Sequence, residues 1–375
     1  MPDVDLHEFA EWRARDPILI YRNFLLNFQD ITALSGIADR EPRAMRMVSE
    51  REISEEDVVA IERSVIAEVE NAYSAAQSMT EPDPIKDGLG AIWPPTILIK
   101  NERAVEPFDA GLRASFAKED MKGKISLGQS LQRVIRETLI ANKNARVFGE
   151  DVAGFGRHKG GVYGMTLPSL KDSSITAEQI FDTPLSEWAI IGSAIGQSLV
   201  GIIPIAEIQY FPFLSVAVSQ VIDYAATHYY STHIPIHMVL RLPYGAGNVG
   251  GHFHVSSLLE STLFHTPGLK IVDPSTPKDM VGLFRSAVAE DAPIMFKENL
   301  WALSRVFGDS APDGFTIPIG KPALRKEGRD LTIITWGAKT IFDAVLPAIV
   351  RLESEGHSIE LIELRSLQPY NLAFL

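Results

Sequence analysis

Strand-like and helix-like segments alternate from residue 125 to the end of the chain. Short apolar runs have the length and branching of buried strands, and longer stretches with helical periodicity separate them. Consecutive strands joined by a helix run parallel, because the helix is the crossover connection that parallel pairing requires. The alternation therefore predicts an α/β fold with a mostly parallel sheet covered by helices on both faces. The predicted strands of the first part are "ARVFGEDV", "IIPIAEIQ", "PIHMVLRLPYG", "LKIVDPST" and "APIMFKE".

Four stretches before or between these strands are predicted to be helices. The first, "SLGQSLQRVIRETLIAN", repeats apolar side chains at helical spacing, so one of its faces should be buried. The second, "GSAIGQSLVGI", is rich in small residues and suits close packing. The third is "VAVSQVIDYAATHYY", and the fourth, "PKDMVGLFRSAVA", has proline at its start. The apolar face of the first helix comprises Leu127, Leu131, Val134, Ile135 and Leu139.

Residues 309–375 read as the start of a second α/β domain. "LTIITWG" is a predicted strand, "AKTIFDAVLPAIVRLESEG" a helix and "SIELIELRSL" a strand. A single crossover cannot bury both faces of a sheet. We therefore expect this part to be incomplete, so that the chain is a fragment or needs another chain.

The first 124 residues differ in pattern from the rest. Residues 1–83 read as helical, and "SEEDVVAIERSVIAEVENAYSAAQSM" is an amphipathic helix with Ser54 and Asp57 at its start as capping residues. Residues 84–124 contain a proline pair and the charged stretch "FAKEDMKGK", which favours a linker. The first α/β domain is then predicted to cover residues 125–308.

Composition excludes several classes of protein. The 375 residues are 46% hydrophobic, which supports a large core, and no apolar run is long enough to span a bilayer. A net charge of −13 without a basic stripe argues against nucleic-acid binding. The chain has no cysteine, which removes disulfides and thiolate chemistry and fits a cytoplasmic protein.

Two stretches resemble ligand motifs only superficially. The glycine-rich "GAGNVGG" (residues 245–251) is not followed by a helix in the register of a dinucleotide site. The "HFH" that follows could supply two metal ligands, but no further ligand stands at a recognisable spacing. The prediction is therefore that the chain itself holds no metal.

Glu187 ends the stretch "DTPLSE" and precedes the apolar run "WAIIGSAIGQSLVG". A carboxylate entering an apolar helix costs free energy unless a partner uses its charge. One interpretation is structural: Ser186 caps the helix and the helix dipole stabilises the carboxylate. The other is that the carboxylate serves a functional site, with Leu185 and Ile190 giving it a dry setting.

Five segments, taken together and in order, favour the functional interpretation. Over residues 125–375 the chain resembles the beta subunit of the thiamine-diphosphate-dependent, decarboxylating component of 2-oxo acid dehydrogenase complexes. Residues 16–27 and 55–84 are similar to the C-terminal tail of the alpha subunit, which suggests an interior piece of a fused alpha–beta polypeptide. The five segments are "GEDVAGFGRHKGGVY", "DTPLSEWAIIGSAIG", "EIQYFPF", "LPYGAGNVGGHFHVSS" and "FHTPGLKIVDPSTPKDMVGL".

The resemblance implies a fold and a cofactor site. Residues 125–308 would be a transketolase-like pyrimidine-binding domain and residues 309–375 an incomplete transketolase C-terminal-like domain. In the family a carboxyl at the position of Glu187 bonds the aminopyrimidine of thiamine diphosphate and favours its imino form, which takes a proton from the thiazolium. Phe213 falls where an aromatic side chain lies against that ring, and Leu185 and Gln209 fall at positions near it.

The resemblance also implies a second catalytic residue. His254 matches the histidine of the family's His-Ser-Gln-Ser stretch, which lies near the thiazolium and assists acyl transfer to lipoamide. An imidazole suits such proton handling because its pKa is near neutrality. This chain has Val255 and Ser256 in the stretch, so the loop departs from the family pattern.

The implied reaction needs groups that this chain lacks. The diphosphate and Mg²⁺ motif of the family belongs to the alpha portion, and it is absent here. A monovalent cation, K⁺, braces some family members near "AVAEDAPIMF", where this chain has Ala292 in place of a frequent Asn. The implied partners are an alpha subunit or domain, a lipoyl acyltransferase core, and a second alpha–beta unit in a heterotetramer. No nucleic acid or membrane is expected.

Three functions remain open at this point. The first is oxidative decarboxylation of a 2-oxo acid, branched-chain or pyruvate, by an oxidoreductase with a disulfide acceptor. The second is a thiamine diphosphate transferase similar to transketolase or deoxyxylulose-phosphate synthase. The third is a module that acts in assembly and catalyses nothing.

Overall fold

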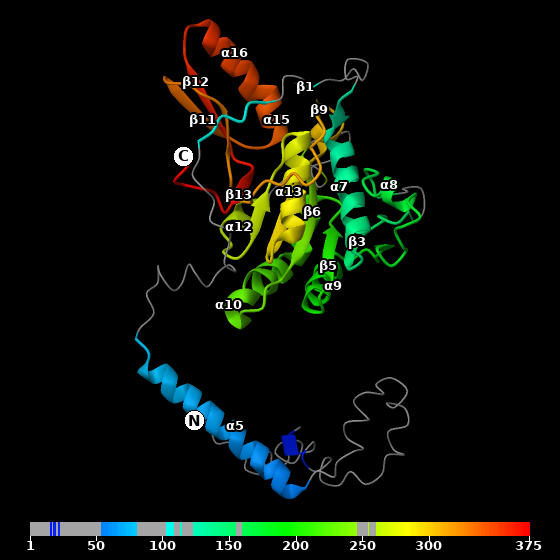
Figure 1. The fold of residues 1–375 in the computed structure, drawn as a ribbon, viewed down its shortest axis with the longest axis vertical. Coiled ribbons are helices and arrows are strands. Elements are labelled where there is room, and N and C mark those ends of the chain that lie inside the picture. Colours follow the sequence, from blue (N-terminus) through cyan, green and yellow to red (C-terminus); the bar gives the residue numbers. More distant parts are fainter. Residues whose placement is uncertain are drawn as a thin grey trace. The chain divides into compact units, whose positions relative to one another are not determined.

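The chain forms two compact units, residues 1–82 and 83–375. The structure is a computed structural model that describes residues 16, 18–19, 22, 54–80, 103–108, 113–114, 123–154, 160–245, 254 and 260–375. The first unit contains one long helix and the second contains the sheets, as Figure 1 shows.

The long helix of the first unit is α5 (Glu55–Ser78). Its capping box is complete: the Ser54 side chain accepts from the Asp57 backbone N–H, and the Asp57 carboxylate accepts from the Ser54 backbone N–H. The predicted helix and its cap are confirmed. Of its apolar side chains only Val58 is buried, and Arg22 pairs with Glu55 and Glu62. The rest of the region predicted to be helical lies outside the described residues.

The second unit is built on a seven-stranded sheet. The strand order is β13-β7-β8-β6-β5-β3-β4, and every pair is parallel except β13 with β7. This confirms the predicted α/β class with a mostly parallel sheet. The strands are β3 (Ala145–Gly149), β4 (Ile180–Asp182), β5 (Ile203–Glu207), β6 (Met238–Tyr244), β7 (Lys270–Val272), β8 (Pro293–Asn299) and β13 (Ser366–Gln368).

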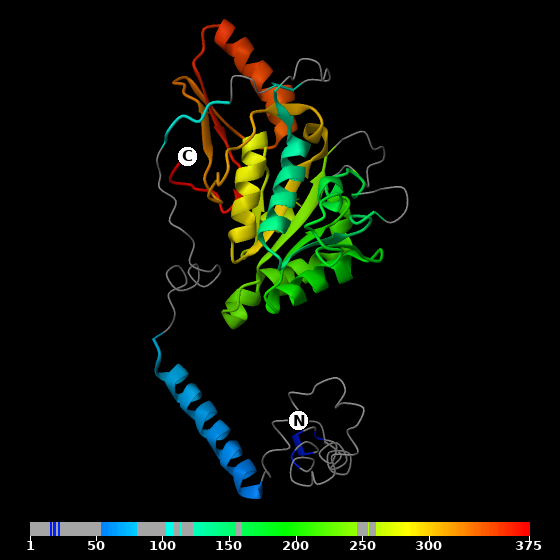
Figure 2. The same ribbon diagram turned by 45° about the vertical axis from the view of Figure 1, so that its right-hand side comes forward.

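Helices cover both faces of this sheet, because successive strand residues are apolar and point to opposite sides. On one face α7 (Leu127–Ala141) and α13 (Pro277–Ala289) lie side by side, and the predicted apolar face of α7 is buried there. On the other face α9 (Glu187–Leu199) packs with the helical segment after β5 (Figures 1 and 2).

The helical segment after β5 is less regular than predicted. A 3-10 helix, η3 (Phe211–Ala217), leads to a π-helix, η4 (Gln220–Ala226), and then to α10 (His228–Thr232). The expectation of one continuous helix was wrong in this detail. Such switches in hydrogen-bond pattern are frequent at functional sites, and this one begins four residues after β5 ends.

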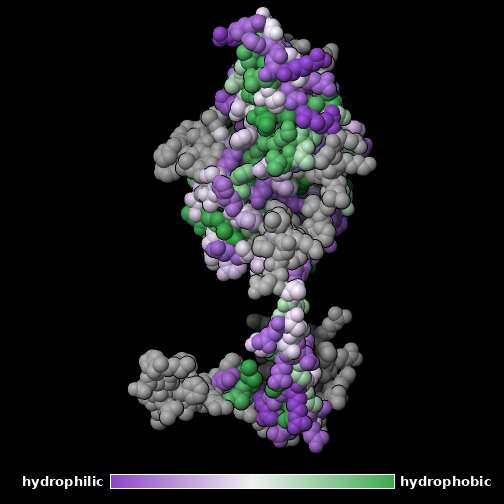
Figure 3. Space-filling model, turned by 90° about the vertical axis from the view of Figure 1, so that its left-hand side faces the viewer, coloured by the Kyte–Doolittle hydropathy of each residue, from purple (hydrophilic) through white to green (hydrophobic). Residues whose placement is uncertain are grey.

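A three-stranded sheet follows near the C-terminus, in the order β10-β12-β11. It consists of β10 (Ala323–Lys326), β11 (Leu331–Thr335) and β12 (Ile359–Glu363), and β11 pairs parallel with β12. Helix α16 (Leu346–Ser354) packs with Ile359 and Leu361 of β12. Ile334, Trp336 and Leu372 stay exposed, and Figure 3 shows a hydrophobic patch over this part of the molecule.

The predicted strand "SIELIELRSL" is two strands that belong to different sheets. β12 ends at Glu363, and β13 begins at Ser366 in the seven-stranded sheet. Arg365 lies between them and is buried, because it pairs with Asp279 and donates to the carbonyls of Lys321 and Pro322. Periodicity alone missed the break, because β13 has only three residues and carries no period of its own.

Some residues of the predicted linker belong to the second unit. Strand β1 (Arg113–Ala114) pairs with β9 (Val306–Gly308), which also pairs with β2 (Ile125–Ser126). Val105 forms a bridge with Leu324. Two-residue strands carry no periodic signal, so the sequence could not show these attachments. The short helices are α8 (Leu167–Leu170), α12 (Glu260–Phe264), α14 (Leu300–Leu303), α15 (Ala338–Thr340) and η5 (Ile341–Val345).

No helix in the described ranges is both long and apolar enough to cross a bilayer.

Asp279 joins helix α13 to strand β10 of the C-terminal sheet and to Arg365, which follows β12. Its carboxylate accepts from Arg325 at 2.6 Å, from Arg365 at 3.3 Å and from the Thr276 hydroxyl at 2.7 Å. Thr276 is the N-cap of α13, and its hydroxyl accepts from the Asp279 backbone N–H. All four side chains are buried. The guanidinium groups hold the pKa of Asp279 below its usual range, against the effect of burial, which acts to raise it.

We expect Asp279→Ala to lower the free energy of unfolding by about 3–5 kcal/mol, because it leaves buried guanidinium charge without its partner. Urea denaturation of the full chain measures this change. The matched control is Asp313→Ala, which removes a fully exposed carboxylate that pairs with Arg133 and should change the value by less than about 0.5 kcal/mol. Equal effects of the two variants would contradict the structural role of Asp279.

Candidate functional site

Acidic side chains gather where β3 and β5 end at the carboxyl edge of the sheet. Glu150 follows β3 directly, and Glu207 is the last residue of β5. The two strands approach so closely that a Cβ on Gly149 would lie 2.6 Å from the Glu207 carbonyl oxygen, which explains the glycine before Glu150. Both glutamates are buried, at 4% and 2% exposure.

Arg241 on the neighbouring strand β6 neutralises part of this charge. It donates to both carboxylate oxygens of Glu298, at 2.6 and 2.9 Å, and to Oε2 of Glu207. These contacts raise the pKa of Arg241, so the guanidinium stays charged despite complete burial. The other oxygen of Glu207, Oε1, is buried and has no hydrogen-bond partner among the described residues.

Glu150 keeps its proton at unusually high pH. Burial is the largest cause, and the nearby charges of Glu187, Asp151 and Glu207 add to it, so the pKa of Glu150 is raised to about 7. Its Oε1 is also buried without a hydrogen-bond partner in the described structure. The edge therefore holds one carboxyl that titrates near neutrality beside the half-buried Glu187.

An aromatic cluster stands beside these acids. The ring of Tyr210 meets His254 edge-on at 4.7 Å between centroids, Phe213 at 5.3 Å and Tyr163 at 5.9 Å. Phe213 also meets His254, at 5.6 Å. The Nδ1 atom of His254 is buried and lacks a hydrogen-bond partner within the described part of the chain. An unpaired buried nitrogen is costly unless a ligand or water meets it.

Four of the five predicted site residues belong to this edge. Gln209 donates to the Asp151 carboxylate at 3.2 Å and to the Glu150 carbonyl at 3.4 Å. Phe213 and His254 share contacts with Tyr210, and Glu187 acts on Glu150 through its charge. The fifth, Leu185, is 83% exposed.

The immediate surroundings of Glu187 differ from the expectation. Leu185 is too exposed to give the carboxylate a dry wall within this chain, whereas Ile190 is buried. The structural interpretation also fails in part, because the Ser186 side chain makes no capping hydrogen bond to α9. The dipole of α9 still favours a carboxylate in its first turn.

Sequence reasoning missed Glu150, Glu207, Tyr210 and Arg241. The first three stand at or just after the ends of predicted strands, where ligands of open α/β sheets bind. That rule could have selected them. Arg241 lies inside a strand, and nothing in its sequence context signals that it pairs with two carboxylates.

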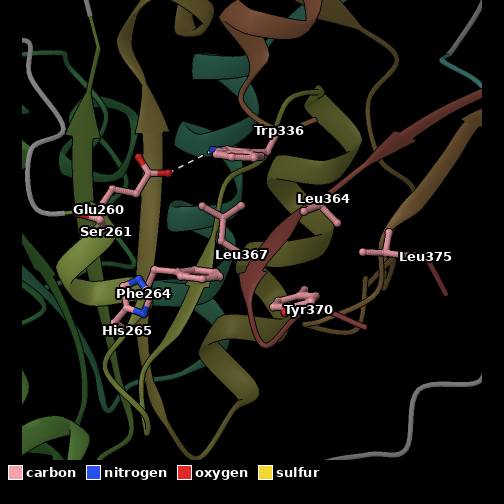
Figure 4. Close-up of a pocket in the computed structure, with 9 residues that line it drawn as sticks. All are labelled: Glu260, Ser261, Phe264, His265, Trp336, Leu364, Leu367, Tyr370 and Leu375. Carbon is pink, nitrogen blue, oxygen red and sulfur yellow. Dashed lines mark hydrogen bonds between the residues drawn. The ribbon is translucent and has the colours of Figure 1, made fainter. Parts of the chain in front are cut away.

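A separate pocket of about 580 Å³ is lined by α12, Trp336 and residues near the C-terminus. None of the predicted site residues lines it. Figure 4 shows Phe264 and Tyr370 across it from Trp336 and Glu260. Among the described residues no three histidine or acidic side chains are placed to hold a metal ion, and the chain has no cysteine.

Residues 123–300 match the family "Transketolase, pyrimidine binding domain". The 2-oxoisovalerate dehydrogenase subunit beta of Bacillus subtilis is 38% identical over 244 residues, which are 64% of this chain and 71% of that protein. The chain belongs to the family of 2-oxo acid dehydrogenase beta subunits. The pyruvate dehydrogenase E1 component subunit beta of Acholeplasma laidlawii is 36% identical over 65% of this chain and 73% of its own length.

Two further comparisons give another relative and a protein that shares only the fold. The mitochondrial 2-oxoisovalerate dehydrogenase subunit beta of Dictyostelium discoideum is 40% identical over 67% of this chain and 66% of its own length. The transketolase of Campylobacter jejuni shares the fold with a TM-score of 0.52 at 15% identity, over 67% of this chain and 37% of the transketolase. This dehydrogenase beta-subunit chain thus spans little more than a third of that transketolase.

We expect Glu150→Gln to make the stability of the chain less sensitive to pH. A raised pKa in the folded state means that only the unfolded state releases the proton as pH rises from about 4.3 to 7, so the wild type loses stability over that window. The variant should gain on the order of 1 kcal/mol over the wild type at pH 8, after solvent screening is allowed for, and little at pH 4. Urea denaturation at both pH values measures this, and an equal difference at both would contradict the assigned pKa.

Proposed function

We propose that this chain is the pyrimidine-binding half of a 2-oxo acid dehydrogenase. The reaction is oxidative decarboxylation of a 2-oxo acid, branched-chain or pyruvate, with transfer of the acyl group to lipoamide. The observation that carries the proposal is the meeting of Glu187, Glu150, Phe213 and His254 at one edge of the sheet in a beta-subunit fold.

The residues at this edge fit thiamine diphosphate. Glu187 would hold the aminopyrimidine ring, with Gln209 and Leu185 near it, and Phe213 offers an aromatic face for stacking. Nδ1 of His254 and Oε1 of Glu150 are buried and have no hydrogen-bond partner among the described residues, so a bound ligand could satisfy them. When bound, the cofactor supplies a nucleophilic thiazolium carbon and an electron sink for decarboxylation.

The two glutamates have different tasks in this proposal. Glu187 shares a proton with a ring nitrogen of the ligand. Glu150 titrates near neutrality, so it can take up or release a proton beside Glu187 at physiological pH. Its protonated form also removes the repulsion between the Glu150 and Glu187 carboxylates.

His254 has the second proton task. Its ring stands against Tyr210 and Phe213, next to the face that Phe213 would present to the cofactor. The role we assign to the imidazole is to hold or donate a proton as the acyl group leaves for the lipoyl dithiolane.

A partner completes the site on the side of Leu185. Leu185, just before α9, is 83% exposed, and Trp188, in the first turn of α9, is 53% exposed. We assign the covering surface to a diphosphate-binding alpha subunit or domain, which would also hold Mg²⁺. Two such alpha–beta units would pair in a heterotetramer that serves a lipoyl acyltransferase core. A K⁺ ion near residues 287–296 is part of the same proposal.

The domain boundaries belong to the proposal as well. Residues 1–83 would be an alpha-like tail in a fused polypeptide, 84–124 a linker, 125–308 the pyrimidine-binding domain and 309–375 part of a C-terminal α/β domain. Parallel pairs such as β11 and β12 occur in sheets that are covered on both faces. Ile334 on β11 and Trp336 just after it are exposed, so one face of this pair lacks cover, which supports the last assignment.

One alternative keeps the cofactor and changes the reaction. The shared fold with transketolase allows a sugar-phosphate transferase similar to transketolase or deoxyxylulose-phosphate synthase. That enzyme would turn over sugar phosphates without lipoamide. The other alternative is an assembly module without catalysis.

We expect Glu187→Gln to lower 2-oxo acid decarboxylation by 10²–10⁴-fold in the complete alpha–beta assembly, because the amide cannot exchange a proton with the cofactor ring. The measurement is turnover of pyruvate, of a branched-chain 2-oxo acid and of a sugar phosphate by the wild type and the variant, together with the assembly state by light scattering. Glu178→Gln, an exposed carboxylate in the segment before β4, is the matched control and should keep wild-type activity.

Each alternative has a distinct outcome in this experiment. Unchanged activity of Glu187→Gln would show that Glu187 has no catalytic role. An assembly that forms but turns over neither 2-oxo acid nor sugar phosphate supports the module, and turnover of sugar phosphates alone supports the transferase.

The isolated chain should bind thiamine diphosphate weakly, with a dissociation constant well above that of the assembly, because the diphosphate and Mg²⁺ contacts lie in the alpha portion. Titration calorimetry with and without Mg²⁺ measures this. Tight, Mg²⁺-dependent binding by the chain alone would contradict a site shared between two portions.

A further inference from the structure

Tyr210 contacts every other ring of the aromatic cluster. Its ring centroid lies 4.7 Å from that of His254, 5.3 Å from that of Phe213 and 5.9 Å from that of Tyr163. All three contacts are edge-on, an arrangement that aromatic rings favour because the positive edge of one ring meets the negative face of the other. Tyr210 is also buried, so packing decides where its ring lies.

The backbone that carries Tyr210 is anchored on both sides. Before it, the backbone N–H of the buried Ile208 donates to the Arg241 carbonyl of β6 at 3.1 Å. After it, the Phe213 backbone N–H donates to the Tyr210 carbonyl at 2.9 Å, where η3 begins. Phe211, between them, is buried. The Tyr210 ring therefore reaches the cluster from a backbone that the sheet holds in place.

Tyr163 supports the Tyr210 ring from a different connection. It is half-buried and lies between β3 and β4, whereas Tyr210 follows β5. Among the ring contacts of the described residues, Tyr163 meets Tyr210 but neither Phe213 nor His254. An effect of the Tyr163 ring on His254 would therefore pass through Tyr210.

The imidazole of His254 is placed by rings. Tyr210 is the nearer ring, and Phe213 lies 5.6 Å away between centroids. The Nδ1 atom of His254 is buried and accepts no hydrogen bond from, and donates none to, a described residue. Within the described part of the chain, the orientation of this imidazole thus depends on ring packing, and Tyr210 makes the closest contact.

We propose that Tyr210 is a positioning residue that holds the His254 imidazole against Phe213, and that Tyr163 supports it in this role. The catalytic consequence rests on the proposed function, whereas the placement of His254 does not. Misplacing a catalytic group by about 1 Å can cost about 10²-fold in rate. Acyl transfer to lipoamide, the step assigned to His254, should therefore suffer when the Tyr210 ring is removed.

The direct test measures the nuclear Overhauser effect between the ring protons of His254 and Phe213 in the full chain. This cross-peak reports the distance between the two rings and does not depend on the ring current of Tyr210. The wild type should show it, with His254 assigned through His254→Asn. Tyr210→Leu keeps an apolar side chain without a ring and should lose the cross-peak, whereas Tyr210→Phe keeps the ring and should retain it.

The matched control is Phe284→Leu. Phe284 is a buried ring on α13 that meets Phe296 edge-on at 5.1 Å, in the cluster on the other face of the sheet. Its replacement removes a ring from a similar pair and should leave the cross-peak between His254 and Phe213 unchanged.

Tyr163→Leu covers a failure of Tyr210→Leu to fold. It leaves both rings that touch His254 in the chain and should weaken the cross-peak by less than Tyr210→Leu does. A wild-type cross-peak in folded Tyr210→Leu would overturn the proposal, as would one in Tyr163→Leu if Tyr210→Leu does not fold. Loss of the cross-peak in Tyr210→Phe would assign the effect to the hydroxyl and overturn the role of the ring.

Activity in the alpha–beta assembly gives the second readout. In Tyr210→Leu, acyl transfer to lipoamide should fall 10-fold to 100-fold, while decarboxylation with an artificial electron acceptor should fall less than threefold. Tyr210→Phe should restore both. Equal losses in the two steps would contradict a role through His254. If the cross-peak is lost in Tyr210→Leu but the wild-type assembly decarboxylates no 2-oxo acid, the proposed function fails and the positioning role of Tyr210 remains.

Discussion

The buried guanidinium of Arg241 is the interaction on which the functional edge depends. It donates to both oxygens of Glu298 but to only one oxygen of Glu207. One guanidinium cannot balance two carboxylates, so negative charge remains at the end of β5. Without Arg241, the two buried carboxylates on the strands that flank β6 would lose the counter-charge with which both pair. Burial, followed by the charges of Glu187, Asp151 and Glu207, raises the pKa of Glu150 and leaves a proton there near neutral pH.

Sheet topology brings the remaining parts to the same place. In the strand order β8-β6-β5-β3 the carboxyl ends lie next to one another, so residues that follow different strands meet there. Glu150, Tyr210 and His254 come from three different connections. The backbone of the parallel strands is the rigid part, and the chemistry stands on the connections between them.

This chain buries some of the site residues and leaves others exposed. Glu150 and Glu207 are enclosed by the sheet, but Glu187 is half-buried and Leu185 is almost fully exposed. A carboxylate that must share its proton with a ligand and not with water needs cover on that side. The second polypeptide of the proposed function would supply this cover.

The sequence by itself determined the alternation of strands and helices, the capped helix α5 and the buried face of α7. These features depend on neighbours within a few residues, which periodicity and pattern can show. Four of the residues at the functional edge were indicated only by the resemblance to a known family. Only the tertiary structure decided that "SIELIELRSL" divides between two sheets, that Arg241 joins Glu207 to Glu298, and that Lys297 contacts both Tyr244 and Glu260. Each of these rests on side chains far apart in the sequence, and no local pattern encodes which buried charge meets which partner.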